Sequence, residues 1–259
     1  WLGNAQELIK NKDIPLSEVI GTRDDIMVYL RYKGVEDSMA FNIMESVRKG
    51  KGLTPQMEEK MLEADVPDWY IWSCKRIKYM FPKADAAAYV MMAFRIAYFK
   101  VYYPLAYYNA YFTVRATAFN YELMCQGKDY LEIQLADYKK RYNQLTKKEQ
   151  DTYRDMRIVQ EMYARGFEFH PLDIYKAKAN EFQIINGKIM PALSAIEGLG
   201  EKAALGVVEA VKNGPFLSLD SFKARTKVSS TVVESMVRLN ILEGLPESDQ
   251  MSFTDFLEL

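Results

Sequence analysis

The stretch between Pro82 and Pro104 constrains the fold more than any other, because it reads KADAAAYVMMAFRIAYFKVYY without an internal glycine or proline. Proline is tolerated at helix ends but not inside helices, so the pattern predicts one long helix from Asp85 to about Tyr103. This helix opens with three consecutive alanines, residues 86–88, which are too small to bury much apolar surface. We expect either a second helix packed unusually close to this face or a flat ligand lying against it.

Most of the remaining chain has the apolar spacing of helices. The sequence predicts helices over Asp24 to Tyr32, from a cap at Ser38 through Val47, from Thr54-Pro55 through Met61, between Pro67 and Pro82, and from Leu105 to about Val114. Residues 120–165 read as charged, solvated helices. Asn186-Gly187 then lies between two short apolar runs, which is typical of a β-hairpin. The predicted fold is mainly α, with one small β-hairpin and a boundary near residue 166.

Composition restricts the class of protein. With 259 residues, of which 49% are hydrophobic and 13% aromatic, the chain is expected to form real cores and not a disordered ensemble. Its formal net charge of -1 gives no global basic field, although local patches suffice for nucleic-acid binding. Cys74 and Cys125 lack zinc-site spacing and favour a reducing compartment. No apolar run approaches the ~18 residues that span a bilayer. Because the chain starts at Trp1 and shows no signal peptide, we expect a piece of a longer cytoplasmic protein.

The sharpest short motif is IEGLGEKAA, residues 196–204. We expect a helix to end before Gly198-Leu199-Gly200 and a second helix to start at Glu201, with positive φ possible at the glycines. Backbone amides in such a turn, together with the next helix N-terminus, form a site for one phosphate, and Lys202 adds a charge beside it. This helix-hairpin-helix pattern holds a duplex through its backbone without reading sequence. The alternative is a glycine-rich loop that only caps two structural helices.

A second helical pair follows over residues 218–242, with Lys227-Val228-Ser229-Ser230 at its weaker hairpin. We interpret this pair mainly as the packing partner of the first. Paired hairpins commonly form one compact module, so residues 190–245 are predicted to hold a nucleic-acid duplex.

The order of IGTRDDIMVYL, RKGKG, FPKADAAAYVMMAFRIAYFKVYYP, IINGKIMPALSAIEGLG and GPFLSLDSF resembles the C-terminal part of bacterial family C replicative DNA polymerases. It is most similar to the PolC type of DNA polymerase III alpha subunit from Gram-positive bacteria, over nearly the whole chain. The resemblance implies polymerase fingers in residues 1–118, a helical connector in 119–166, a tandem helix-hairpin-helix domain in 167–245 and a C-terminal tail in 246–259. In this interpretation the flat ligand is a nascent base pair, whose shape the small residues would accommodate.

The resemblance also implies a nucleotide site around the long helix, because Lys and Arg can neutralise a triphosphate. Its candidate residues are Arg48, Lys49, Lys51, Lys83, Ala88, Tyr89, Arg95 and Lys100. Each of these cations could equally be a solvated surface charge. One position departs from the family, since Asp85 stands where histidine is usual. A carboxylate would repel phosphate, so we assign Asp85 no phosphate contact and expect it to cap the helix.

Polymerisation needs two metal ions held by carboxylates, and in the family these Mg²⁺ ligands belong to the palm. We assign no catalytic or metal-binding residue to this chain: Asp24 and Asp25 are adjacent and point apart on a helix, and His170 has no catalytic partners. As a segment of a DNA-directed DNA polymerase, a nucleotidyltransferase, the chain is expected to bind DNA and nucleotide but not to polymerise alone.

The tail resembles the short peptide by which such polymerases bind the sliding clamp, with Gln250, Met251 and Phe253 as candidate anchors; an ordinary disordered terminus is the alternative. The expected partners are primer–template DNA, a dNTP, the sliding clamp and other replisome subunits, with no membrane. Two other functions remain open. One is a non-catalytic helix-hairpin-helix DNA-binding or repair scaffold, and the other is a helical protein-interaction module with a Met-rich surface.

Overall fold

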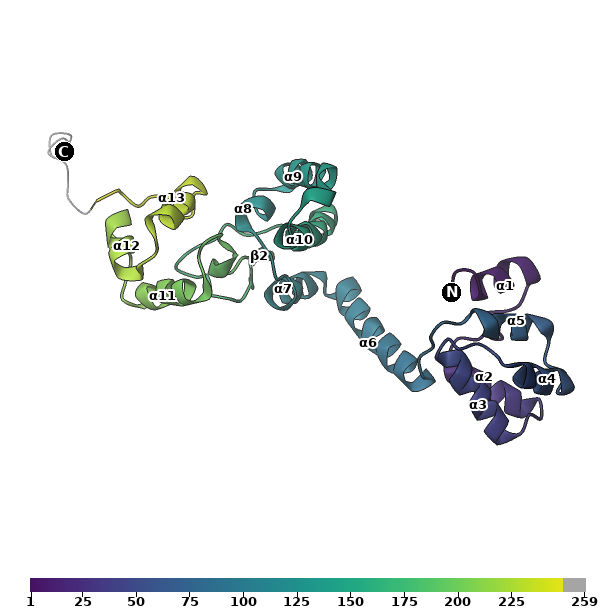
Figure 1. Ribbon diagram of the computed structural model, residues 1–259. Helices are drawn as coiled ribbons and strands as arrows, with labels where there is room; N and C mark the ends of the chain where they lie inside the picture. Colours follow the sequence, from purple (N-terminus) through teal and green to yellow (C-terminus); the bar gives the residue numbers. More distant parts are fainter. Residues whose placement is uncertain (249–259) are drawn as a thin grey trace, which may run out of the picture. The chain divides into compact units, whose positions relative to one another are not determined.

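The computed structural model describes residues 1–248, which fall into two compact units: Trp1–Arg95, and a second unit that begins at Ile96 (Figure 1). The boundary lies inside one helix, α6 (Lys83–Tyr102). Helices dominate both units, and the sheet found within the described residues has two antiparallel strands, β1 (Gln183–Ile185) and β2 (Lys188–Met190). The predicted mainly α fold with a small β-hairpin is confirmed.

The first unit contains α1 (Ala5–Lys12), α2 (Arg23–Tyr32), α3 (Asp37–Arg48), α4 (Pro55–Glu63), α5 (Asp68–Arg76) and the first part of α6. Helices α2 and α3 lie side by side in Figure 1 and make the most extensive contact between helices among the described residues. Their apolar residues recur every three or four positions and therefore share one face. That face meets α4 and α5 in a core that includes Ile26, Leu30, Ile43, Met61 and Tyr70, all almost fully buried.

Helix boundaries in this unit follow local capping chemistry, with two corrections. Thr54 accepts a hydrogen bond from the Met57 amide, with Pro55 in the first turn, as predicted. The cap of α3 is Glu36 and not Ser38: its carboxylate accepts the Ser38 and Met39 amides, at 3.0 Å each. The helix predicted between Pro67 and Pro82 ends at Arg76, because residues 77–80 pack against the turn after α3.

The second unit contains the end of α6, then α7 (Pro104–Val114), α8 (Tyr121–Met124), α9 (Lys128–Lys140) and α10 (Lys147–Ala164), followed by the β-hairpin and α11 (Glu201–Lys212), α12 (Leu219–Thr226) and α13 (Ser230–Arg238). Short 3₁₀ turns occur at η1 (Tyr142–Gln144) and η2 (Leu193–Ala195). One continuous core joins α7 to α13 and the β-hairpin, with buried residues from Tyr108 to Leu242.

Aromatic rings link α7 to the rest of this core. The Phe112 ring lies 5.3–5.7 Å from the rings of Phe119, Phe169 and Phe182, and α7 contacts both β-strands. Residues 96–118, which are predicted as part of the fingers, thus belong to the second compact unit. The functional names given to the predicted domains stay predictions.

The β-hairpin turns at Asn186 and Gly187, as the sequence predicts. Both residues have positive φ, 50° and 76°, which suits the tight turn favoured by Asn-Gly. The strands pair Ile184 with Ile189, whose side chain is buried. The hairpin therefore supplies core residues to the second unit.

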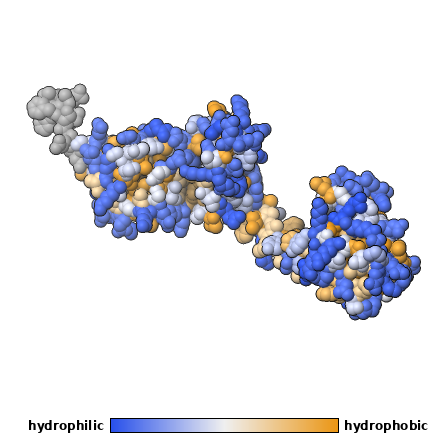
Figure 2. All heavy atoms as spheres, viewed as in Figure 1, coloured by the Kyte–Doolittle hydropathy of each residue, from blue (hydrophilic) through white to orange (hydrophobic). Residues whose placement is uncertain are grey.

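Helix α6 begins at Lys83, two residues before the predicted start, and none of its residues is buried. It is apolar on all sides, with Phe94 72% exposed, and Figure 2 shows a pale to orange surface along it. Asp24 from α2, and not Asp85, caps the helix by accepting the Lys83 amide at 2.6 Å. None of the helices described within residues 1–248 is long and apolar enough to cross a membrane.

Candidate nucleic-acid interface

The predicted phosphate-binding turn lies between η2 and α11. Ile196 and Leu199 are buried and fix the turn, and the Leu199 amide donates to the Ile196 carbonyl at 3.1 Å. Gly198 has φ 81°, as a glycine turn requires, and a Cβ there would lie 3.0 Å from Val232. Gly200 is the N-cap of α11, with φ -66° and ψ 165°. Two expectations are corrected: the element before the turn is a 3₁₀ turn, not a regular helix, and only Gly198 has positive φ.

Unpaired backbone amides gather at this turn. The N–H groups of Gly198, Gly200 and residues 201–203 find no acceptor within the part of the chain that the structure describes, and the first helical bond runs from the Ala204 amide to the Gly200 carbonyl. Apart from its two chain neighbours, no atom of residues 1–248 lies within 4 Å of a Cβ placed on Gly200, so an external group can approach closely. Lys202 is exposed and forms no ion pair in the described residues. Free amides, a helix N-terminus and a nearby cation make a binding site for a phosphate.

The second hairpin, between α12 and α13, supports the first. Lys227 adopts the left-handed conformation with φ 57°, and Ser229 is the N-cap of α13. Val232 of α13 is the residue that approaches Gly198, so the two hairpins touch at the glycine turn. Arg225 stabilises the packing by donating to the Gly214 and Pro215 carbonyls at 2.8 and 2.7 Å. The two helical pairs thus form one compact module.

Two of the three cations of the RKGKG segment, Arg48 and Lys49, gather around one carboxylate in the first unit. Glu45 pairs with Arg48, with Lys49 at 2.8 Å and with Arg23 at 3.8 Å. Hydrogen bonds from Arg48 and then from Lys49 lower the pKa of Glu45 to about 2. The loop is held close to residues 78–80, because a Cβ on Gly50 would meet the Lys78 carbonyl oxygen at 2.3 Å. Arg48 and Lys49 are therefore ordered but already paired.

The start of α6 lies near this cluster. Arg23 connects the two, since its amide donates to the Phe81 carbonyl at 3.1 Å while its guanidinium approaches Glu45. Lys83 pairs with Asp25 at 3.2 Å. Partial burial raises the pKa of Asp25, but hydrogen bonds from Thr22 and Lys83 to its carboxylate outweigh this effect, so the pKa is lowered overall.

The other candidate nucleotide residues lie farther along α6 or elsewhere. Ala88, Tyr89 and Arg95 are exposed, so no helix of the described first unit packs against the end of the alanine run. Lys51 lines a surface pocket of about 340 Å³ together with Lys49. The first unit therefore contains the cations Arg48, Lys49, Lys51 and Lys83. The face of α6 that carries Ala88 and Tyr89 is exposed.

Lys100 belongs to the second unit and has partners that its local sequence does not predict. Its ammonium donates to Glu161 at 2.8 Å, which raises the pKa of Lys100. Arg165 donates to the Lys100 carbonyl at 3.1 Å and to the Tyr108 hydroxyl at 3.2 Å. Together, Glu161 and Arg165 fix the last turn of α6 to α10. Glu161 lies 61 residues from Lys100 in sequence, so no local pattern signals the pair.

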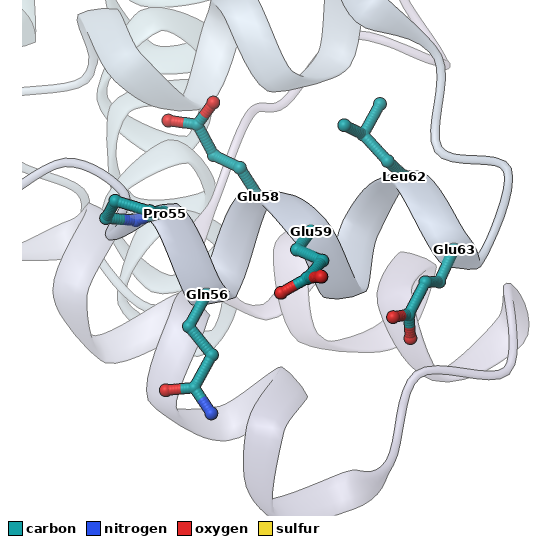
Figure 3. Close-up of a pocket in the computed structure, with 6 residues that line it drawn as sticks. All are labelled: Pro55, Gln56, Glu58, Glu59, Leu62 and Glu63. Carbon is teal, nitrogen blue, oxygen red and sulfur yellow. The ribbon is translucent and has the colours of Figure 1, made fainter.

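The other carboxylates of residues 1–248 provide no metal site. A surface pocket of about 730 Å³ on α4 is lined by acids; Figure 3 shows Glu58 on one side of the helix and Glu59 and Glu63 on the other. Such a lining repels phosphate. Among residues 1–248 there is no group of three or more acidic, histidine or cysteine side chains placed to hold a metal. Burial raises the pKa of Cys74 to about 12, so that thiol is unreactive. Gln250, Met251 and Phe253 lie outside the described residues.

Comparison with known proteins shows which proteins the chain is similar to. The family described as "Helix-hairpin-helix motif" matches residues 166–251. DNA polymerase III PolC-type of Listeria welshimeri and of Bacillus subtilis are each 52% identical over 97% of the chain, and that of Staphylococcus aureus is 51% identical over 98%. The chain spans only 18% of the length of each of these proteins. It is a relative of one segment of the PolC-type DNA polymerase III proteins of bacteria.

Proposed function

We propose that the chain serves as a segment of a bacterial replicative DNA polymerase, a DNA-directed nucleotidyltransferase of the cytoplasm. Residues 167–245 hold the primer–template duplex, and the region around α6 positions the incoming dNTP against the template. The observation that carries this proposal is the row of unpaired amides at Gly198, Gly200 and residues 201–203, beside Lys202, which forms no ion pair within residues 1–248.

The duplex grip follows from that row. A DNA phosphate can accept several of the amides at once, and charge-assisted hydrogen bonds are roughly twice as strong as neutral ones. No base-reading side chain is needed for this contact. The grip is therefore independent of sequence, as a replicative enzyme requires while the duplex moves past it.

The nucleotide-positioning role rests on α6. A helix that is apolar on all sides is normally covered, yet α6 has no buried residue. Ala88 and Tyr89 give it a small and flat face against which a base pair can lie. Lys83 and Arg95 offer charges for phosphates, whereas Lys100 contacts a nucleotide only after leaving Glu161. Mg²⁺ does not fit Asp24 and Asp25, because Asp24 caps α6 and Asp25 accepts the Thr22 amide. We assign the metal ligands to carboxylates outside this chain and the clamp contact to the tail.

Primer extension tests the proposal directly. We expect the 259-residue chain to bind primer–template DNA but to extend no primer in Mg²⁺ or Mn²⁺. The fingers position the nucleotide, whereas the metal ions of the palm are needed for the nucleotidyl transfer itself. A full-length PolC-type enzyme that carries this segment is expected to extend it. Asp24→Asn with Asp25→Asn in that enzyme should leave extension dependent on Mg²⁺. The proposal would be overturned if the isolated chain extended a primer and the double substitution abolished that extension.

Steady-state kinetics of the full-length enzyme test the nucleotide face separately. We expect Arg95→Ala to raise the KM for dNTP several-fold while DNA affinity stays unchanged. Ala88→Leu should lower kcat/KM, because it adds bulk where the base pair lies. Lys10→Ala on α1 removes an exposed cation away from this face and serves as the control. Control-like kinetics for both variants would remove α6 from the nucleotide site.

A further inference from the structure

Glu197 places a carboxylate in the hairpin, directly before Gly198, where a DNA phosphate is proposed to bind. Its two oxygens have separate partners: Lys148 Nζ donates to Oε1 and Asn120 Nδ2 donates to Oε2, each at 3.1 Å. Neither partner belongs to the hairpin module. Both come from the helical connector: Lys148 lies 49 residues and Asn120 lies 77 residues before Glu197 in sequence.

The two donors lie at the N-terminal ends of α8 and α10. Asn120 is the N-cap of α8, where its side-chain oxygen accepts the Leu123 amide at 3.0 Å. Lys148 lies within the capping box of α10, in which the side chains of Thr146 and Glu149 each accept a hydrogen bond from the other's backbone amide. The connector therefore presents an amide and an ammonium to the hairpin from fixed backbone positions.

A cleft of about 560 Å³ lies between these donors and the hairpin. Its polar lining includes Asn120, Lys148, Thr152, Ser194 and Glu197, and it reaches Gly198 and Gly200. A phosphate that binds the hairpin amides thus comes next to Lys148. The Lys148–Glu197 pair is open to solvent, with side chains 75% and 64% exposed. Ion pairs this exposed are weak, so a phosphate can displace Glu197 from Lys148.

We propose that the connector completes the duplex-binding surface: Lys148 exchanges Glu197 for a backbone phosphate of the duplex, and Glu197 is an internal competitor that moderates the affinity. Asn120 retains the carboxylate after Lys148 leaves it. The ligand is the phosphodiester backbone next to the phosphate held by the hairpin. This inference rests on the proposed function of the hairpin, and it adds a contact outside that motif.

The test is a fluorescence-anisotropy titration of the 259-residue chain with a labelled duplex at several salt concentrations. Lys148→Gln is expected to lower the affinity several-fold and to reduce the slope of log K against log salt by about 0.9, the value for one phosphate contact. Lys147→Gln is the matched control, because Lys147 is exposed and pairs with Asp151 at 3.4 Å. Circular dichroism should show the same fold for all variants.

Glu197→Gln is expected to raise the affinity several-fold, and most of this gain should vanish when Lys148→Gln is added. Affinity and slope for Lys148→Gln equal to those of the Lys147→Gln control would overturn the inference, as would a lower affinity for Glu197→Gln. If Gly200→Val weakens binding but Lys148→Gln does not, the hairpin function stands and only the connector contact fails. Absence of duplex binding by the unmodified chain would overturn both.

Discussion

Gly200→Val is expected to weaken duplex binding by roughly ten- to hundredfold, the loss that follows when a hydrogen bond to a charged group worth about 1.5–3 kcal/mol is removed. The backbone of Gly200 has φ -66° and ψ 165°, which valine can adopt, and beyond its chain neighbours no described residue lies within 4 Å of the added Cβ. The new side chain therefore leaves the fold intact but occupies the space through which a phosphate reaches the amides of α11. Anisotropy measures the affinity, and circular dichroism checks the fold.

Gly198→Val is the informative companion. Here φ is 81° and the added Cβ would lie 3.0 Å from Val232, so the substitution strains the turn and separates the two hairpins. We expect this variant to lose thermal stability as well as affinity, whereas Gly200→Val loses affinity alone. Equal duplex affinity for Gly200→Val and the unmodified chain would mean that the turn is only structural.

Phe112→Ala is expected to lower the free energy of unfolding of the second unit by about 3–5 kcal/mol, as is typical of a large buried aromatic residue. Phe112 is 2% exposed and contacts the rings of Phe119, Phe169 and Phe182, so its removal leaves a cavity among groups that cannot easily close it. Hydrogen exchange of amides in α7 and α10 reports this unit by itself.

Phe94→Ala provides the control, because Phe94 is 72% exposed on α6 and its removal should change stability by no more than about 0.5 kcal/mol. Similar effects of the two substitutions would contradict the placement of α7 in the core of the second unit.

Elements with local chemical signatures could be predicted from the sequence. Asn186-Gly187 requires positive φ at both positions and formed the turn of the β-hairpin, and Thr54-Pro55 started α4. The glycine turn before α11 was also located correctly, because Gly198 has to adopt a conformation that other residues avoid. The conformation of Gly200 could not be predicted in this way, because its φ is one that any residue can adopt.

Features that depend on distant contacts could not be predicted. Lys100 has the sequence of a free helix cation, but Glu161 binds it from α10. The apolar spacing of α5 continues in the sequence beyond Arg76. The backbone nevertheless leaves the helix there, and the Met80 amide donates a hydrogen bond to the Arg48 carbonyl. Glu197 and Lys148 likewise lie far apart in sequence, so only the folded chain shows their pairing.

The salt dependence of duplex binding by the unmodified chain tests the central claim most directly. Anisotropy titrations with two duplexes of unrelated sequence should give equal affinities. For both duplexes the logarithm of the binding constant should fall linearly with the logarithm of salt concentration, at about 0.9 for each phosphate contacted. Absence of binding, preference for one sequence or an affinity that salt does not change would contradict the claim that the Gly198–Gly200 turn holds DNA through its backbone.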